Sequence, residues 1–123
     1  SVNYTNGSSE RLVGECIAAD RDHFVVATKY TLRDNNADRR DPNAGGNQRK
    51  NLVQSLEHSL KRLRTDYLDL LWVHVWDGLT PVDEIMRAVE NQLRAIPLVR
   101  LMLCDAGGGF ISGVGTGGSL PPV

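Results

Sequence analysis

The sequence has 123 residues, with 14 basic and 15 acidic side chains and a formal net charge of −1. A (β/α)₈ barrel takes ~250 residues, so this length holds one small domain or a piece of a larger one. Hydrophobic residues make up 41% and charged residues 24%, which is the balance of an ordinary folded protein. The charges are mixed along the chain, so they do not indicate a nucleic-acid partner.

The cysteines do not indicate disulfides or a metal site, and the apolar segments do not indicate a membrane span or a signal peptide. Cys16 and Cys104 lie far apart and form no CxxC motif, and the three histidines have no metal-ligand spacing with them. No apolar run has membrane-spanning length or the pattern of a signal peptide. We therefore expect a reduced, cytoplasmic protein with no bound metal and no membrane or nucleic-acid partner.

The first third of the chain predicts a loop, a helix and a buried strand. Residues 1–7 are rich in turn formers, and Gly7 and Ser8 favour the start of a helix. Glu10 lies in the first turn, where a negative charge suits the helix dipole. The β-branched run at 23–28 predicts a strand buried on both faces. The apolar stripe expected on the helix consists of Leu12, Val13, Cys16 and Ile17.

The middle third predicts a long polar loop, a second helix and a second strand. Residues 32–48 form the loop, and loops of this length in compact domains are often functional. Asn47 is placed to cap the helix, which we expect to run to about Arg64. The apolar run 67–73 then predicts a strand that ends beside His74. The buried stripe expected on this helix consists of Leu52, Leu56, Leu60 and Leu63.

The last third predicts one more helix and strand, followed by an irregular tail. Thr80 and Pro81 favour a helix start, and the run 98–103 is expected to form a strand. Residues 104–123 are rich in glycine and proline and lack the lysine of a phosphate-binding loop. The residues expected to face inward on this helix are Ile85, Val89 and Leu93.

The alternation of helices and strands predicts an α/β fold with about three parallel strands and helices between them. We expect one domain over residues 1–103 and a separate glycine- and proline-rich tail over 104–123.

Three side chains are candidates for proton chemistry. Tyr4 precedes an Asn-Gly turn, and Lys29 and His74 each follow an apolar run near the carboxyl end of an expected strand. Parallel α/β folds build their sites at this end of the sheet. A phenol is a weak acid at neutral pH, and a nearby ammonium favours its phenolate form. Taken singly, a lysine at a strand end is usually solvated and a histidine there is more often structural than catalytic. Tyr4 alone is consistent with a surface aromatic.

Several segments resemble the aldo-keto reductase family. The run Asn-Tyr-Thr-Asn-Gly-Ser-Ser-Glu at 3–10 resembles the segment that bears the family's catalytic tyrosine. Residues 25–30, Val-Val-Ala-Thr-Lys-Tyr, resemble the strand that bears the catalytic lysine. The helix-to-strand run 59–70 resembles the signature that leads to the catalytic histidine. The likeness covers about residues 1–95 and extends through 46–52, 76–77 and 80–86.

The resemblance implies a partial (β/α)₈ TIM-barrel-like fragment that reduces an aldehyde or ketone with NADPH as the hydride donor. By this resemblance Tyr4 is the general acid, Lys29 assists its proton release and His74 orients the substrate carbonyl. Trp76 and Tyr30 are expected to line the substrate pocket. We identify no residues for cofactor binding from the sequence.

The sequence lacks parts that the resemblance leads one to expect. An aspartate before the tyrosine, the first two barrel strands and the cofactor-rich latter half have no counterpart here. A truncated or frame-shifted reductase, weakly active or inactive, is therefore one expectation. A non-catalytic assembly remnant and a binding module without turnover are the alternatives. Three strands cannot close a barrel, so we also expect a homo-oligomer that buries the exposed sheet edges.

Overall fold

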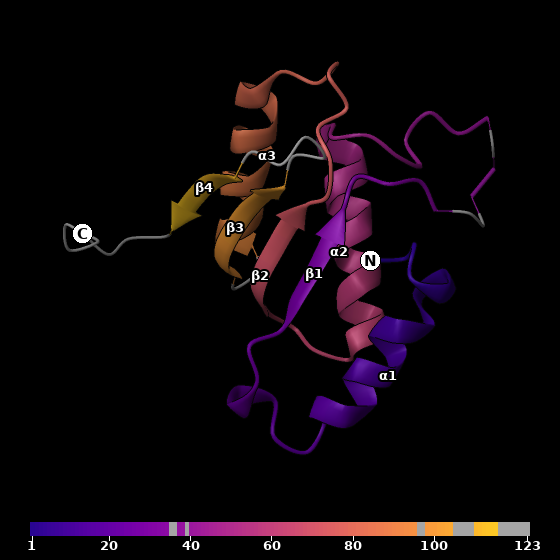
Figure 1. The fold of residues 1–123 in the computed structure, drawn as a ribbon, viewed down its shortest axis with the longest axis vertical. Helices are drawn as coiled ribbons and strands as arrows, with labels where there is room; N and C mark the ends of the chain where they lie inside the picture. The colour runs from indigo at the N-terminus through magenta and orange to yellow at the C-terminus, as the bar shows by residue number, and fades with distance from the viewer. Residues whose placement is uncertain (35–36, 39, 96–97, 105–109, 116–123) are drawn as a thin grey trace.

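The computed structural model describes residues 1–34, 37–38, 40–95, 98–104 and 110–115. They form a four-stranded sheet with the spatial order β1-β2-β3-β4 (Figure 1). The first three strands are parallel and β4 is antiparallel to β3. The strands are β1 (Ala27–Tyr30), β2 (Leu68–Val73), β3 (Leu98–Cys104) and β4 (Phe110–Gly115).

Helices connect the parallel strands, as the alternation in the sequence predicts. Helix α2 (Arg49–Leu63) joins β1 to β2, and α3 (Val82–Ala95) joins β2 to β3. Both lie on the same side of the sheet (Figure 1). Helix α1 (Ser8–Ile17) packs beside α2, and short 3₁₀ turns flank it, η1 (Thr5–Gly7) and η2 (Arg21–His23). The prediction of an α/β fold with parallel strands is confirmed.

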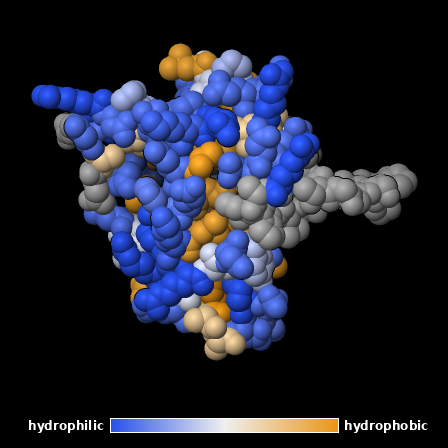
Figure 2. Space-filling view, turned by 180° about the vertical axis from the view of Figure 1, so that it is seen from behind, coloured by the Kyte–Doolittle hydropathy of each residue, from blue (hydrophilic) through white to orange (hydrophobic). Residues whose placement is uncertain are grey.

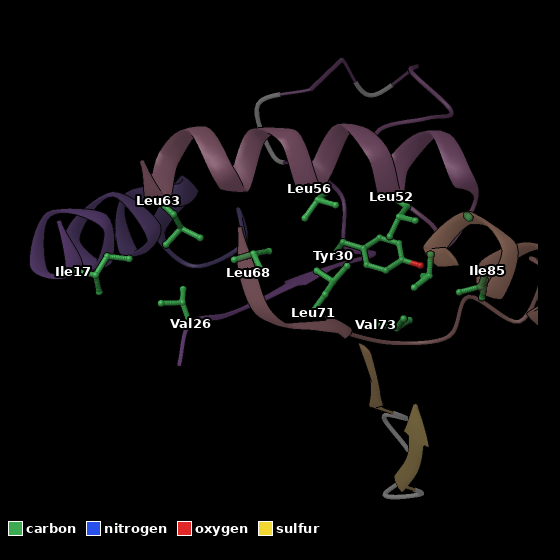
Figure 3. Packing of buried hydrophobic residues seen from close by; sticks show 12 residues of the cluster. Ile17, Val26, Tyr30, Leu52, Leu56, Leu63, Leu68, Leu71, Val73 and Ile85 are labelled. Atoms are coloured by element: carbon green, nitrogen blue, oxygen red, sulfur yellow. The ribbon is translucent and has the colours of Figure 1, made fainter. Parts of the chain in front are cut away.

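The hydrophobic core lies between α2, α3 and the sheet. Leu52, Leu56 and Leu63 of α2 point toward Leu68 and Leu71 of β2 (Figure 3). All five side chains are at most 2% exposed, so the stripe predicted for α2 is largely confirmed, with Leu60 partly buried at its margin. The whole cluster consists of Ile17, Val26, Tyr30, Leu52, Leu56, Leu63, Leu68, Leu71, Val73, Ile85, Ala88 and Val89.

The stripe predicted for α1 is wrong except at Ile17. Leu12 is 62% exposed and Val13 is 40% exposed, and Cys16 is also exposed. The helix instead turns its Gly14 side toward the end of α2, where a Cβ at position 14 would lie 2.6 Å from the carbonyl oxygen of Leu63. Such close backbone approach requires glycine, and it sets which face of α1 is buried.

Strand β1 begins and ends later than the sequence predicts. The run 23–28 was expected to be a strand, but η2 ends at His23 and the ladder begins at Ala27. Val25 is 82% exposed. Burial then alternates along β1, because the helices cover only one face of this edge strand. The expectation of a strand buried on both faces is therefore wrong for β1.

The tail is not wholly irregular. Residues 110–115 form β4, which pairs with β3 from Cys104↔Phe110 to Arg100↔Gly115 with one register irregularity. The prediction of an irregular segment is wrong there, because the run 110–115 contains Phe, Ile and Val, which favour strands, and it pairs along the edge of β3. The predictions for residues 105–109 and 116–123, and for the side chain of Leu93, lie outside the described residues.

The side of the molecule opposite to the view of Figure 1 is mainly hydrophilic, with a band of hydrophobic residues through its middle (Figure 2). Within the described ranges, no helix combines the length and the apolar character that crossing a membrane requires.

Candidate active site

Tyr4 stands at the turn that leads into α1. Thr5, Asn6 and Gly7 have φ angles of 50°, 52° and 80°, so three consecutive residues adopt left-handed backbone. Asn6 and Gly7 tolerate this conformation best, which explains the Asn-Gly pair in the sequence. The Ser8 hydroxyl donates to the carbonyl oxygen of Thr5 at 2.8 Å and closes the turn. The Tyr4 side chain is left 46% exposed.

Lys29 reaches Tyr4 from the sheet. It lies on β1, directly opposite Trp72 of β2, on the side of the sheet away from α2. Its Nζ donates a hydrogen bond to the Tyr4 hydroxyl at 3.0 Å and lies 5.4 Å from the centre of the tyrosine ring. The phenol and the ammonium are therefore in direct contact, as the predicted pairing requires.

His74 completes the group from the end of β2. Its backbone N–H donates to the Tyr30 carbonyl oxygen at 3.1 Å, which extends the parallel ladder by one residue and fixes the histidine beside β1. Its ring lies 6.3 Å from the Tyr4 ring, with 25° between the two planes. The structure thus brings Tyr4, Lys29 and His74 together.

The electrostatics of His74 favour a neutral ring. Burial lowers the pKa of His74, and the positive charges of Lys29 and of the Ser1 amino group lower it further. Among the described side chains, Nδ1 of His74 is a buried atom with no hydrogen-bond partner. A neutral imidazole with an unpartnered nitrogen can form a hydrogen bond with an oxygen-bearing group of a bound molecule.

The two residues expected to line a pocket behave differently. Tyr30 belongs to the core, where its ring packs beneath α2 near Leu52 and Leu71 (Figure 3). It is 3% exposed, and burial raises the pKa of its phenol. The expectation that the Tyr30 ring contacts substrate is wrong, because alternation along β1 places Tyr30 on the face opposite to Lys29. Trp76 follows His74 by two residues and is 54% exposed.

The structure reveals a buried charged network behind the site that sequence reasoning missed. Glu10 of α1 is 5% exposed and accepts hydrogen bonds from the Ser1 amino group, the Thr28 hydroxyl and Arg62 Nε. Thr28 precedes Lys29 on β1, so the network joins α1 and α2 to the strand that carries the lysine. An acidic residue in the first turn of a helix reads as a dipole partner, and nothing in the local pattern indicates its burial.

Asn47 was predicted to cap α2, and this prediction is wrong. The N-cap position is Gln48, which makes no side-chain cap. Asn47 is fully buried, and its side chain instead bonds to Thr31, Val75 and Asp77. Gly45 and Gly46, directly before Asn47, are the local signal in the sequence. A Cβ at either position would lie within 3.2 Å of a neighbouring atom.

The fold and the site together define a class of protein. It is a parallel α/β protein that gathers a phenol, an ammonium and a neutral imidazole toward the carboxyl ends of adjacent strands.

Comparison with known proteins gives the family. The model of the Aldo/keto reductase family matches residues 1–95, and the chain belongs to that family. It is 39% identical to norsolorinic acid reductase stcV of Emericella nidulans over 84% of this chain and 28% of that protein. It is 44% identical to a norsolorinic acid reductase of Aspergillus flavus over 72% of this chain and 24% of that protein.

A third relative is named as an alcohol dehydrogenase. The chain is 37% identical to aryl-alcohol dehydrogenase GME11368 of Pestalotiopsis microspora over 84% of this chain and 28% of that protein. The chain thus spans about a quarter of the length of these curated relatives.

Proposed function

We propose that this chain carries the proton-donating part of an aldo-keto reductase site, which reduces an aldehyde or ketone to an alcohol. The observation that carries the proposal is the 3.0 Å hydrogen bond between Lys29 Nζ and the Tyr4 hydroxyl, with the His74 ring beside it. Membership of the aldo-keto reductase family supports the same chemistry. The architecture that fits both is part of a (β/α)₈ barrel, with three parallel strands and their helices outside.

Each of the three side chains has one role in this proposal. Tyr4 gives its hydroxyl proton to the substrate oxygen as the carbonyl becomes an alcohol. The Lys29 ammonium stabilises the negative charge that this transfer leaves on the phenol oxygen. The neutral His74 ring donates a hydrogen bond to the carbonyl oxygen and so orients it toward Tyr4. Trp76, which is exposed and follows His74 by two residues, offers an aromatic face to the rest of the substrate.

The cofactor that the family implies is NADPH, which supplies a hydride when bound. Its phosphates need a cradle of free backbone N–H groups or a cluster of basic side chains. In the glycine-rich loop after β1, the N–H groups of Gly46 and Asn47 already donate to Thr31 and Asp77. We therefore assign none of the described residues to the cofactor, and binding of the dinucleotide by this chain is left to the titration that follows.

Titration of the purified chain with NADPH tests whether the site is functional. We expect saturable quenching of tryptophan emission together with enhanced nicotinamide emission, because Trp76 follows His74 by two residues and is exposed. A Trp76→Phe variant is the control, since it should lose much of the quenching and keep the nicotinamide signal. The absence of both signals up to millimolar NADPH would contradict reductase function for this chain.

Self-association is a second proposal, and the uncovered side of the sheet supports it. The helices cover one side, whereas Ala27 is exposed and Lys29 and Trp72 are partly exposed on the other. Strand β1 also lies at an edge of the sheet, where another strand can pair. We propose that a second copy of this chain pairs along this exposed sheet edge. Light scattering at micromolar concentration should give at least twice the monomer mass of 13.5 kDa, and a strictly monomeric solution would contradict the proposal.

A further inference from the structure

Two loops at the carboxyl ends of β1 and β2 are joined by a reciprocal pair of hydrogen bonds. The backbone N–H of Asn47 donates to Oδ2 of Asp77 at 2.7 Å, and the backbone N–H of Asp77 donates to Oδ1 of Asn47 at 2.6 Å. Asn47 is fully buried. Its Nδ2 donates to the Thr31 hydroxyl at 2.8 Å and to the Val75 carbonyl oxygen at 3.1 Å. The Asn47 side chain therefore binds the backbone of both Val75 and Asp77, in the segment directly after His74.

Asp77 then fixes the turn that follows Trp76. Its Oδ1 accepts from the backbone N–H groups of Leu79 and Thr80 at 2.9 and 2.8 Å, and its Oδ2 accepts from the Thr80 hydroxyl at 2.7 Å. This folds residues 77–80 back on themselves. The Thr80 carbonyl oxygen accepts from the indole Nε1 of Trp76 at 3.1 Å. The orientation of the Trp76 ring thus depends on a turn that one carboxylate closes.

The Asp77 carboxylate is charged at neutral pH. Burial raises the pKa of Asp77, but hydrogen bonds from the backbone N–H groups of Thr80, Asn47 and Leu79 outweigh this and bring it to about 2. The charged Asp77 carboxylate accepts hydrogen bonds from four donors and so fixes the backbone of the turn. Trp76 remains 54% exposed even so, which means that the ring is positioned by this turn rather than by burial in the core.

We propose that Asn47 and Asp77 are positioning residues, which hold Trp76 and the segment directly after His74 in place. Through the fixed indole they set the contact between the site and the apolar part of a carbonyl substrate. The use of this contact in catalysis rests on the proposed function. The positioning itself does not, because it follows from the hydrogen bonds alone.

Exchange of the Trp76 indole N–H with solvent tests the positioning without any ligand. In ¹H–¹⁵N spectra of the chain, Trp76→Phe assigns the two indole signals. In Asp77→Ala we expect the Trp76 indole N–H to exchange at least about tenfold faster and its signal to shift, while the Trp72 signal stays in place. Asp83→Ala, which removes an exposed carboxylate on α3, should change neither signal. An unchanged Trp76 signal in Asp77→Ala would overturn the proposal.

A milder variant keeps the test decisive if Asp77→Ala does not fold. Asp77→Asn retains the size of the side chain but replaces one acceptor oxygen with an NH₂ group, which cannot accept from Asn47 or Thr80. We expect a smaller acceleration of exchange in the same direction. Equal exchange in this folded variant and in the unaltered chain would overturn the proposal.

Kinetics separate this inference from the proposed function. With an aromatic aldehyde, Asp77→Asn should raise KM severalfold and leave kcat and its pH profile within about twofold, because Tyr4 and Lys29 are not touched. A fall in kcat without a change in KM would overturn the role in substrate contact. A chain that reduces no carbonyl contradicts the proposed function, and the indole exchange experiment then still decides whether Asp77 positions Trp76.

Discussion

Tyr4→Phe is expected to lower the rate of aldehyde reduction at least about 100-fold, since a positioned general acid contributes about 10²–10⁴ to a rate. The variant removes the hydroxyl that accepts the Lys29 hydrogen bond and would give its proton to the substrate oxygen. The fold should persist, because the Tyr4 side chain is 46% exposed and lies outside the core cluster. The measurement is NADPH oxidation with and without aldehyde, together with the thermal midpoint of each protein.

Tyr67→Phe is the matched control for this prediction. Tyr67 precedes β2, at the end of the sheet opposite to His74, and its hydroxyl bonds to Asp22. Removing this hydroxyl makes the same chemical change away from the site, so the rate of reduction should stay within about twofold. A Tyr4→Phe protein that reduces aldehydes at the unaltered rate would show that the phenol is not the acid.

The candidate site could be predicted to a large extent because its residues follow local rules. Apolar runs end beside Lys29 and His74, and parallel strands place such ends at one edge of the sheet. The Asn-Gly turn made Tyr4 a candidate, and the resemblance supplied its role as the general acid. The pocket role expected for Tyr30 is wrong because adjacent residues of a strand point to opposite faces. Tyr30 therefore lies on the core face of β1, opposite to Lys29.

The fold shows the same division between local and long-range information. Helix α2 is predictable because four leucines at helical spacing define one buried stripe. Helix α1 is not, because its buried face is chosen by the close approach of Gly14 to Leu63, a contact between residues distant in sequence. The buried polar groups, Asn47 and Glu10, were missed for the same reason. Their hydrogen-bond partners come from other helices, strands and loops, and the periodicity of the sequence does not predict such contacts.

Glu10→Gln is expected to reduce the free energy of unfolding by about 3 kcal/mol, the range for a buried ion pair that loses one partner. Glu10 lies between the Ser1 amino group, Thr28 and Arg62, and its side chain is 6% exposed. Glutamine fills the same space but leaves the Arg62 guanidinium without a countercharge in a largely buried position. Urea unfolding at pH 7 measures the loss.

Glu15→Gln is the matched control, because Glu15 is 3.8 Å from Arg64 and both side chains are more than half exposed. Exposed pairs of this kind contribute less than about 1 kcal/mol, so this variant should unfold almost like the unaltered chain. If Glu10→Gln reduced the free energy of unfolding as little as Glu15→Gln does, solvent would screen the Glu10 ion pairs as well.

The dependence of stability on pH gives an independent measure of the same network. Burial raises the pKa of Glu10, but hydrogen bonds from the Ser1 amino group and Thr28, the charge of that amino group and the Arg62 hydrogen bond bring it to about 2. Because this pKa lies below the unfolded value of 4.5, the stabilisation is fully present above pH 4.5 and is lost as the pH falls toward 2. Glu10→Gln should remove this part of the acid sensitivity, whereas Glu15→Gln should keep it. Since Thr28 adjoins Lys29, acid that protonates Glu10 should also loosen the strand that holds the lysine against Tyr4.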